Sequence, residues 1–122
     1  MSEEVELFEA RQETPRVLPT EARVLYERGL ASLSAGEDRD ALAALRAAHE
    51  MAPEHARLRS ALGVAIARAE SDFEASRRLC ESAAKQEFFN PEVYLNLARV
   101  YLRFGRRSEA LRYLRRGQMI DP

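Results

Sequence analysis

Two histidines and a single cysteine are the side chains of this sequence best suited to binding a metal or attacking a substrate. His49 and His55 lie six residues apart, whereas two metal ligands on one helix face lie three or four residues apart. Cys80 has no second cysteine and no histidine close to it in the sequence, so neither a thiolate metal site nor a histidine-activated nucleophile is predicted. The glycines are isolated, which argues against a glycine-rich phosphate loop. We therefore expect no metal, no cofactor and no enzymatic activity.

Arginine is the other chemically distinctive residue type, and it is concentrated near the C-terminal end. From residue 90 onward seven arginines stand against three acidic residues, a local net charge of +4. An arginine-rich face can neutralise phosphates, which is one interpretation of this cluster. Few aromatic residues interleave with the arginines, however, and their helical spacing places them in the core. We therefore expect a protein partner rather than nucleic acid.

The composition is that of one folded globular domain. The chain has 122 residues, of which 46% are hydrophobic and 32% charged, with a net charge of −1. This balance favours neither nucleic acid nor an anionic membrane as a partner. The single cysteine fits a reducing compartment, and the acidic first residues lack the apolar core of a signal peptide. No apolar run approaches the roughly 20 residues that span a bilayer, so we expect a cytoplasmic protein without membrane segments.

Residues 1–20 differ from the rest of the chain. They contain five glutamates and two arginines, a local net charge of −3. The pattern over residues 3–12 predicts a short helix with Val5 and Phe8 on one face, and two prolines then favour an extended stretch. The sequence therefore predicts an acidic N-terminal tail that is extended or partly helical.

Beyond the tail, the sequence predicts helices only. Apolar and small residues recur at three- and four-residue spacing, and no alternating strand pattern is present. Breakers at regular intervals separate these stretches, and the connections are short, so consecutive helices must pack antiparallel. The fold class is therefore predicted to be all-α. The predicted helices are about 21–35, 38–51, 54–69, 72–86, 91–104 and 107–119.

Two of these helices have clear start signals. Ser71 and Glu74 have the spacing of a capping box. Asn90, Pro91 and Glu92 supply an N-cap side chain, a proline for the first helical position and an acid near the positive helix end. These signals place helix starts close to residues 72 and 91.

A repeat with a period of 34 or 35 residues is the strongest pattern in the chain. Gly29, Gly63 and Ala98 are related by these steps. The same steps relate Ala41, Ala75 and Ala110, then Leu45, Leu79 and Leu114, and also Ala48, Ser82 and Gly117. A two-helix unit of this period resembles the tetratricopeptide repeat. The resemblance implies an α-solenoid of three antiparallel helix pairs with a right-handed superhelix, in units of about 21–53, 54–90 and 91–122.

The recurring small residues predict where the two helices of a unit cross closely. A larger side chain at Gly29, Gly63 or Ala98 would force the helix axes apart. The second unit departs from its siblings, because it lacks their closing proline and inserts Phe88 and Phe89. The junction between the second and third units is therefore predicted to be irregular. The two phenylalanines either fill the seam between units or form an exposed apolar patch.

The resemblance also implies where a partner would bind. In this family the first helices of successive units line a concave groove that takes peptides or helices. The residues expected there form an apolar strip with a basic rim, which suits an extended or helical segment with apolar anchors and some acids. The carboxylate clamp of the chaperone-binding branch is absent, because Tyr26, Leu30 and Val64 occupy matching positions. The predicted groove residues are Arg23, Tyr26, Leu30, Arg57, Ser60, Val64, Arg68, Leu95, Asn96, Arg99 and Arg103, with Leu33, Ala67 and Glu92 beside them.

These observations predict a protein–protein interaction adaptor or scaffold. One alternative is a small secretion chaperone built from three such repeats. Another is a self-associating fragment of a larger repeat regulator, because no helix follows to cover Leu111, Tyr113, Leu114 and Ile120 of the last helix. Self-association through that helix is therefore a further prediction.

Overall fold

The computed structural model describes residues 17–121; the tail up to residue 16, with its predicted helix, and Pro122 lie outside them. The described residues form α-helices and no strands, and every helix boundary lies within two residues of its predicted position. The helices are α2 (Thr20–Ser34), α3 (Asp38–Met51), α4 (Ala56–Glu70), α5 (Phe73–Gln86), α6 (Pro91–Arg103) and α7 (Arg107–Ile120).

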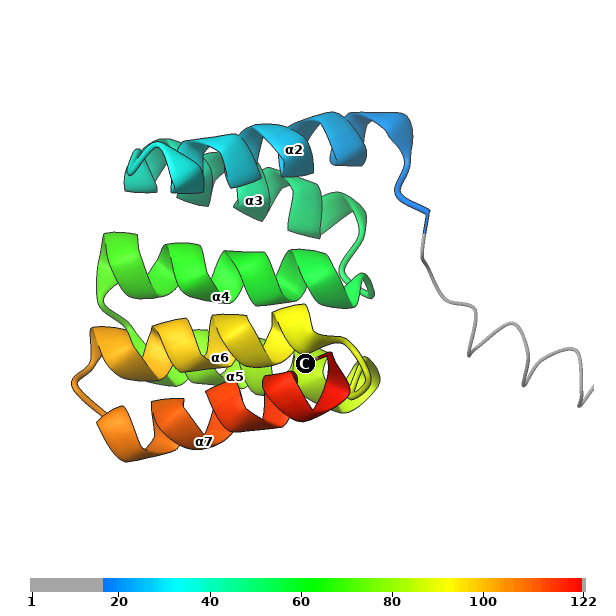
Figure 1. Ribbon diagram of the computed structural model, residues 1–122. Coiled ribbons are helices and arrows are strands. Elements are labelled where there is room, and N and C mark those ends of the chain that lie inside the picture. The colour runs from blue at the N-terminus through cyan, green and yellow to red at the C-terminus, as the bar shows by residue number, and fades with distance from the viewer. Residues whose placement is uncertain (1–16, 122) are drawn as a thin grey trace, which may run out of the picture.

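The helices stack as successive pairs, α2 with α3, α4 with α5 and α6 with α7 (Figure 1). Each pair packs on the next, through α3 against α4 and then through α4 and α5 against α6. Contact between α2 and α4 is slight, so the space between these two first helices is open on one side. The all-α solenoid of three helix pairs predicted from the sequence is confirmed.

Close crossing within the first two pairs depends on the predicted glycines. A Cβ atom added to Gly29 would lie 2.5 Å from Cγ of Leu45. One added to Gly63 would lie 2.5 Å from Sγ of Cys80 and 2.9 Å from the carbonyl oxygen of Ser76. These distances are shorter than Cβ contacts in real proteins, so an alanine fits at neither position without a shift of its neighbours. The glycines are thus the condition for the observed helix separation.

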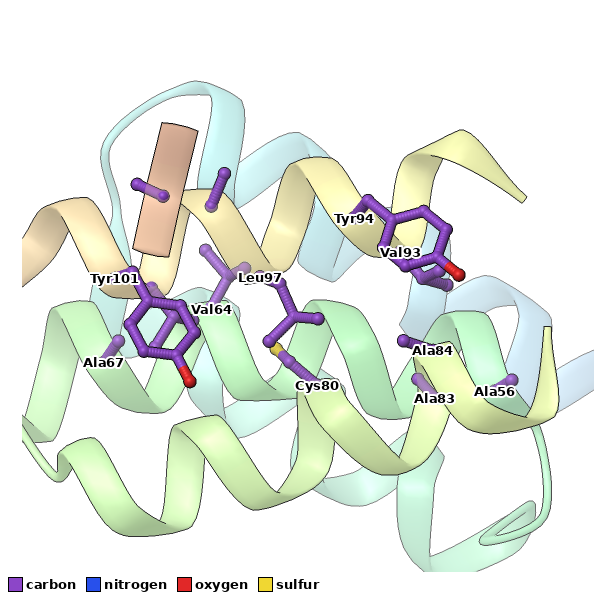
Figure 2. Packing of buried hydrophobic residues seen from close by; sticks show 13 residues of the cluster. Ala56, Val64, Ala67, Cys80, Ala83, Ala84, Val93, Tyr94, Leu97 and Tyr101 are labelled. Atoms are coloured by element: carbon purple, nitrogen blue, oxygen red, sulfur yellow. The ribbon is translucent and has the colours of Figure 1, made fainter. Parts of the chain in front are cut away.

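The apolar core forms two clusters, one on each side of α4. The larger cluster joins α4 through α7 and includes Val64, Cys80 and Leu97, which Figure 2 shows near its middle. The smaller cluster joins α3 and α4 around Leu45, which is fully buried. Because α4 contributes to both clusters, all its residues from 61 to 67 are buried. This helix is therefore the central element of the stack.

The starts of α5 and α6 are fixed by N-cap side chains. Oδ1 of Asn90 accepts a hydrogen bond from the backbone N–H of Glu92 at 3.0 Å, which confirms the predicted start of α6. The predicted capping box at Ser71 is wrong, because Asp72 caps α5 by accepting from the N–H of Ala75 at 3.1 Å. Ser71 instead ends α4 in the left-handed conformation, with φ of 53°. It occupies the place that turn glycines hold in the other two units.

Replacing Ser71 with glycine is expected to stabilise the fold by about 0.5–1 kcal/mol. A left-handed φ strains an L-residue with a Cβ but not glycine, and this relief outweighs the extra entropy that glycine gives the unfolded chain. The measurement is the midpoint of urea unfolding, with Gly105→Ser as the matched control because Gly105 has φ of 73°. The control should lose a similar amount. A midpoint for Ser71→Gly at or below that of the wild type would contradict the expectation.

The loop between α5 and α6 exposes both phenylalanines. The side chains of Phe88 and Phe89 are 66% and 53% exposed, and their rings meet edge to face with centroids 5.7 Å apart. The loop is held through its backbone, since the hydroxyl of Tyr94 donates to the carbonyl oxygen of Phe88 at 2.8 Å. Of the two interpretations left open by the sequence, filling of the seam is wrong and the exposed patch is correct.

Candidate functional site

The first helices of the three pairs, α2, α4 and α6, line one groove. Its volume is about 630 Å³, and it opens where α2 and α4 have little mutual contact. Leu30 on the α2 wall is 38% exposed, whereas Val64 in the floor is only 5% exposed. Tyr26 lines the groove together with these two residues. The groove therefore offers an apolar strip that is accessible on its α2 side.

Most of the predicted site residues are brought together here. Arg23 lies instead in an adjoining hollow, and Arg103 lines a third hollow together with Arg68 and Arg99. Leu95 is half-buried on α6 and is not among the residues that line the groove or these two hollows. The predicted residues that line the groove are Tyr26, Leu30, Arg57, Ser60, Val64, Arg68, Asn96 and Arg99, with Leu33 and Glu92 beside them.

Two buried polar side chains in the floor hold α4 and α6 together. Nδ2 of Asn96 donates to Oγ of Ser60 at 2.8 Å, and these residues are 6% and 1% exposed. Oδ1 of Asn96 accepts from Nη1 of Arg99, also at 2.8 Å. Buried polar groups need such partners, and here the chain supplies them itself. The two residues therefore shape the groove more than they offer free donors to a ligand.

The arginines of the groove are paired with carboxylates of the same chain. The guanidinium of Arg68 lies 2.9 Å from Asp38, which is the shortest of three such pairs. The other two are Arg57 with Glu87 at 3.4 Å and Arg99 with Glu92 at 3.6 Å. All are partly solvated, where ion pairs stabilise little and exchange partners readily. The rim is therefore less positive than the count of arginines suggests.

A second hollow adjoins the groove and contains residues that the sequence reasoning missed. Its volume is about 660 Å³, and it shares Tyr26, Leu30 and Arg57 with the groove. Leu18 and Phe89 extend its apolar lining. The insertion at the junction of the second and third units was the signal that could have found Phe89. Leu18 precedes the first helix, where periodicity carries no information.

His55 is one of the titratable residues that line this hollow. It is 5% exposed and is the N-cap of α4, where its Nδ1 accepts from the backbone N–H of Leu58 at 3.2 Å. Burial lowers its pKa, and Arg57 and Arg59 act in the same direction against the opposing charge of Glu87. Protonation would also remove the lone pair that accepts the capping hydrogen bond. The folded protein therefore favours the neutral imidazole.

The free energy of unfolding is expected to fall as pH is lowered from about 7.5 to 5.5. His55 has a lower pKa when folded than its unfolded value of about 6.5, so the unfolded state binds more protons and stability is lost below that value. One such histidine gives a slope of at most about 1.4 kcal/mol per pH unit. Urea unfolding at four pH values measures it.

His55→Asn keeps an N-cap acceptor but cannot titrate, so its pH slope should be smaller than that of the wild type. Burial also lowers the pKa of His49, so the His55→Asn/His49→Asn variant should be flat across this window. An unchanged slope in the double variant would contradict the assignment.

The cysteine has an inert environment. Cys80 is fully buried, and burial raises the pKa of its thiol to about 12. Its S–H donates to the carbonyl oxygen of Ser60 at 3.4 Å. Within residues 17–121 no group of three or more potential ligand side chains could hold a metal ion. Over the same residues, none of the helices has the length and apolar character needed to cross a membrane.

The fold and the groove define a helical-repeat protein of the α-solenoid class. Residues 67–122 match the family described as "Tetratricopeptide repeat". Tetratricopeptide repeats are generally protein-interaction modules, and the match supports this general role for the chain.

Two solved structures are similar to the whole stack. One, described as "MamA R50E mutant", has a TM-score of 0.65 at 23% sequence identity, covering 85% of this chain and 75% of that chain. The other, "MamA MSR-1 C2", has a TM-score of 0.63 at 22% identity, covering 82% of this chain and 57% of that chain. At this identity the likeness shows a shared fold. No curated protein matches the chain.

Proposed function

We propose that the groove of α2, α4 and α6 binds a peptide or helix of a partner protein. The observation that carries this proposal is the accessible apolar strip, with Leu30 38% exposed above the buried Val64. Tyr26 adds an aromatic side chain of the kind enriched in binding surfaces. A groove of about 630 Å³ has room for a few anchor side chains of such a segment.

The paired arginines refine the chemistry of this ligand. An acid of the ligand must displace or share the internal carboxylate at Arg57, Arg68 or Arg99. Such an exchange between partly solvated ion pairs changes the binding free energy little. Apolar anchors over Tyr26 and Leu30 therefore supply most of the affinity, and acidic residues tune the orientation and the rate of association.

The test selects peptides from a random displayed library and measures their affinity by fluorescence anisotropy. Leu30→Glu should weaken the selected peptides about ten-fold or more, because it places a charge in the apolar strip. Leu111→Glu is the matched control, since Leu111 lies on α7 away from the groove and is 47% exposed. Val64 is too buried for this experiment, because glutamate there would unfold the protein. Equal affinity for wild type and Leu30→Glu would show that the groove is not the binding site.

A further inference from the structure

The first helix pair buries an apolar surface against α4, whereas no helix among residues 17–121 covers the equivalent surface of the third pair. In the first pair, Leu42 and Leu45 are 8% and 0% exposed. Tyr26 and Leu33 of α2 pack with them against α4. The repeat places Leu45 and Leu114 at equivalent positions, 69 residues apart. The same step identifies the matching surface at the other end of the stack.

This matching surface consists of leucines only, and we call it the end face. Its members are Leu95, Leu102, Leu111 and Leu114. Leu102 and Leu111 are 51% and 47% exposed, whereas Leu42, the first-pair equivalent of Leu111, is 8% exposed. Four leucines at seam positions of a repeat array form a surface shaped for one more helix.

Unpaired positive charge surrounds the end face. Arg107 and Arg115 lie one helical turn before and after Leu111, and Arg103 follows Leu102. Of the carboxylates in residues 17–121, none lies within 4.0 Å of these three guanidinium groups. Two end faces brought together would place these charges against each other, which disfavours symmetric pairing. The complementary occupant is an acidic amphipathic helix.

The outer face of α2 is a poor occupant. It carries Glu27 and Arg28 at the positions where α4 carries Ala61 and Leu62, 34 residues later. Both α4 residues are nearly fully buried in the seam. The first helix of the stack is thus polar where an intercalating helix has to be apolar, as expected of a capping face.

We propose that the end face of one molecule binds residues 3–12 of a second copy of this chain. These residues lie outside the described part of the structure, and the proposal rests on their sequence. They include Val5, Leu7 and Phe8 as apolar residues, together with Glu3, Glu4, Glu6 and Glu9. The segment therefore has apolar residues that can pack on the leucines of the end face, and a negative charge that complements the surrounding arginines.

The length of the chain favours a second copy over the same molecule. Packed helices lie about 8–10 Å apart, so a helix on the end face, the third step from α2, lies about 24–30 Å from α2. Residue 12 is five residues from Val17, which precedes α2 in the structure, and five residues span at most about 18 Å. Binding between copies is head to tail, and such contacts build open chains rather than closed dimers.

The experiment measures mass against concentration by sedimentation velocity on the full chain. The average mass of the wild type is expected to rise continuously with concentration beyond that of a dimer. Added salt should weaken this association. Two variants disable one half each: Leu102→Glu/Leu111→Glu on the end face, and Phe8→Glu on the segment. Each alone should weaken association about ten-fold to a hundred-fold. Val24→Glu, on the outer face of α2 with Val24 48% exposed, is the matched control and should associate like wild type.

Mixing the two disabled variants is the decisive step. One retains an intact segment and the other an intact end face, so the mixture should form a complex of two chains that grows no further. Wild type that stays monomeric at high concentration would overturn the proposal. So would association that survives Phe8→Glu, which would indicate pairing of two end faces, or association lost in Val24→Glu, which would indicate stacking through α2. Thermal melts confirm that the variants are folded.

Discussion

Replacing Gly63 with alanine is expected to lower the free energy of unfolding by about 3 kcal/mol. Helix propensity alone predicts a gain of up to about 1 kcal/mol for this change in a helix interior. The added Cβ, however, would lie 2.5 Å from Sγ of Cys80 and 2.9 Å from the carbonyl oxygen of Ser76. A backbone oxygen cannot turn aside as a side chain can, so α4 and α5 must separate, and overpacking of this kind destabilises strongly.

The comparison with Gly117 isolates the steric cause. A Cβ on Gly117 would meet its nearest atoms at 3.5 and 3.6 Å, which is ordinary contact. Gly117→Ala should therefore stabilise by about 0.5–1 kcal/mol, although both glycines are buried in helices. In a double-mutant cycle, Cys80→Ala should recover part of the loss in Gly63→Ala. Urea unfolding measures all four variants, and a neutral Gly63→Ala would contradict the crossing geometry.

Leu45→Ala is expected to cost about 3–4 kcal/mol. Leu45 is fully buried, with 0% of its surface exposed. It fills the space between Gly29 and the apolar face of α4. Removing its isobutyl group leaves a cavity that the helices cannot close, because their backbones already pack closely. Equilibrium unfolding in urea at low protein concentration gives the value.

Leu114→Ala is the matched control, because it is the same truncation at the equivalent position of the third pair. Leu114 is only partly buried, so its truncation should cost about 1 kcal/mol. Equal losses at the two positions under dilute conditions would mean that the end of the stack is covered within a single molecule. This result would be incompatible with an open third pair.

The fold could be predicted because the same two-helix pattern recurs three times in the sequence. Gly29, Gly63 and Ala98 each mark a crossing point, and short connections leave only antiparallel neighbours. The turns between helices were harder to predict than the helices themselves. Both Ser71 and Asp72 are good N-cap residues, and the choice depends on where α4 ends, which its packing decides rather than its composition. Phe88 and Phe89 are exposed because the added residues lengthen the loop without reaching the seam.

The candidate site could be predicted in outline but not in its charges. Helical register puts Tyr26, Leu30 and Val64 on one surface, since that register follows from spacing. The pairing of Arg68 with Asp38 joins residues 30 positions apart on two helices, so it depends on the distance between those helices. For the same reason Leu95, assigned to the groove by register, is not among the residues that line it. Helical register predicts which residues share one face of a helix. The positions of the neighbouring helices determine which residues that face contacts.

The rate at which the buried thiol of Cys80 is chemically labelled measures how often the stack of helices opens. A thiol with a pKa of about 12, enclosed between α4 and α6, is protected from alkylating reagents while the helices stay packed. Labelling must then wait for a molecule to unfold or for its central pairs to separate. Because no other cysteine competes for the reagent, the labelling rate gives the frequency of these rare openings. It can be measured in native buffer, whereas urea titration reports unfolding only in denaturant.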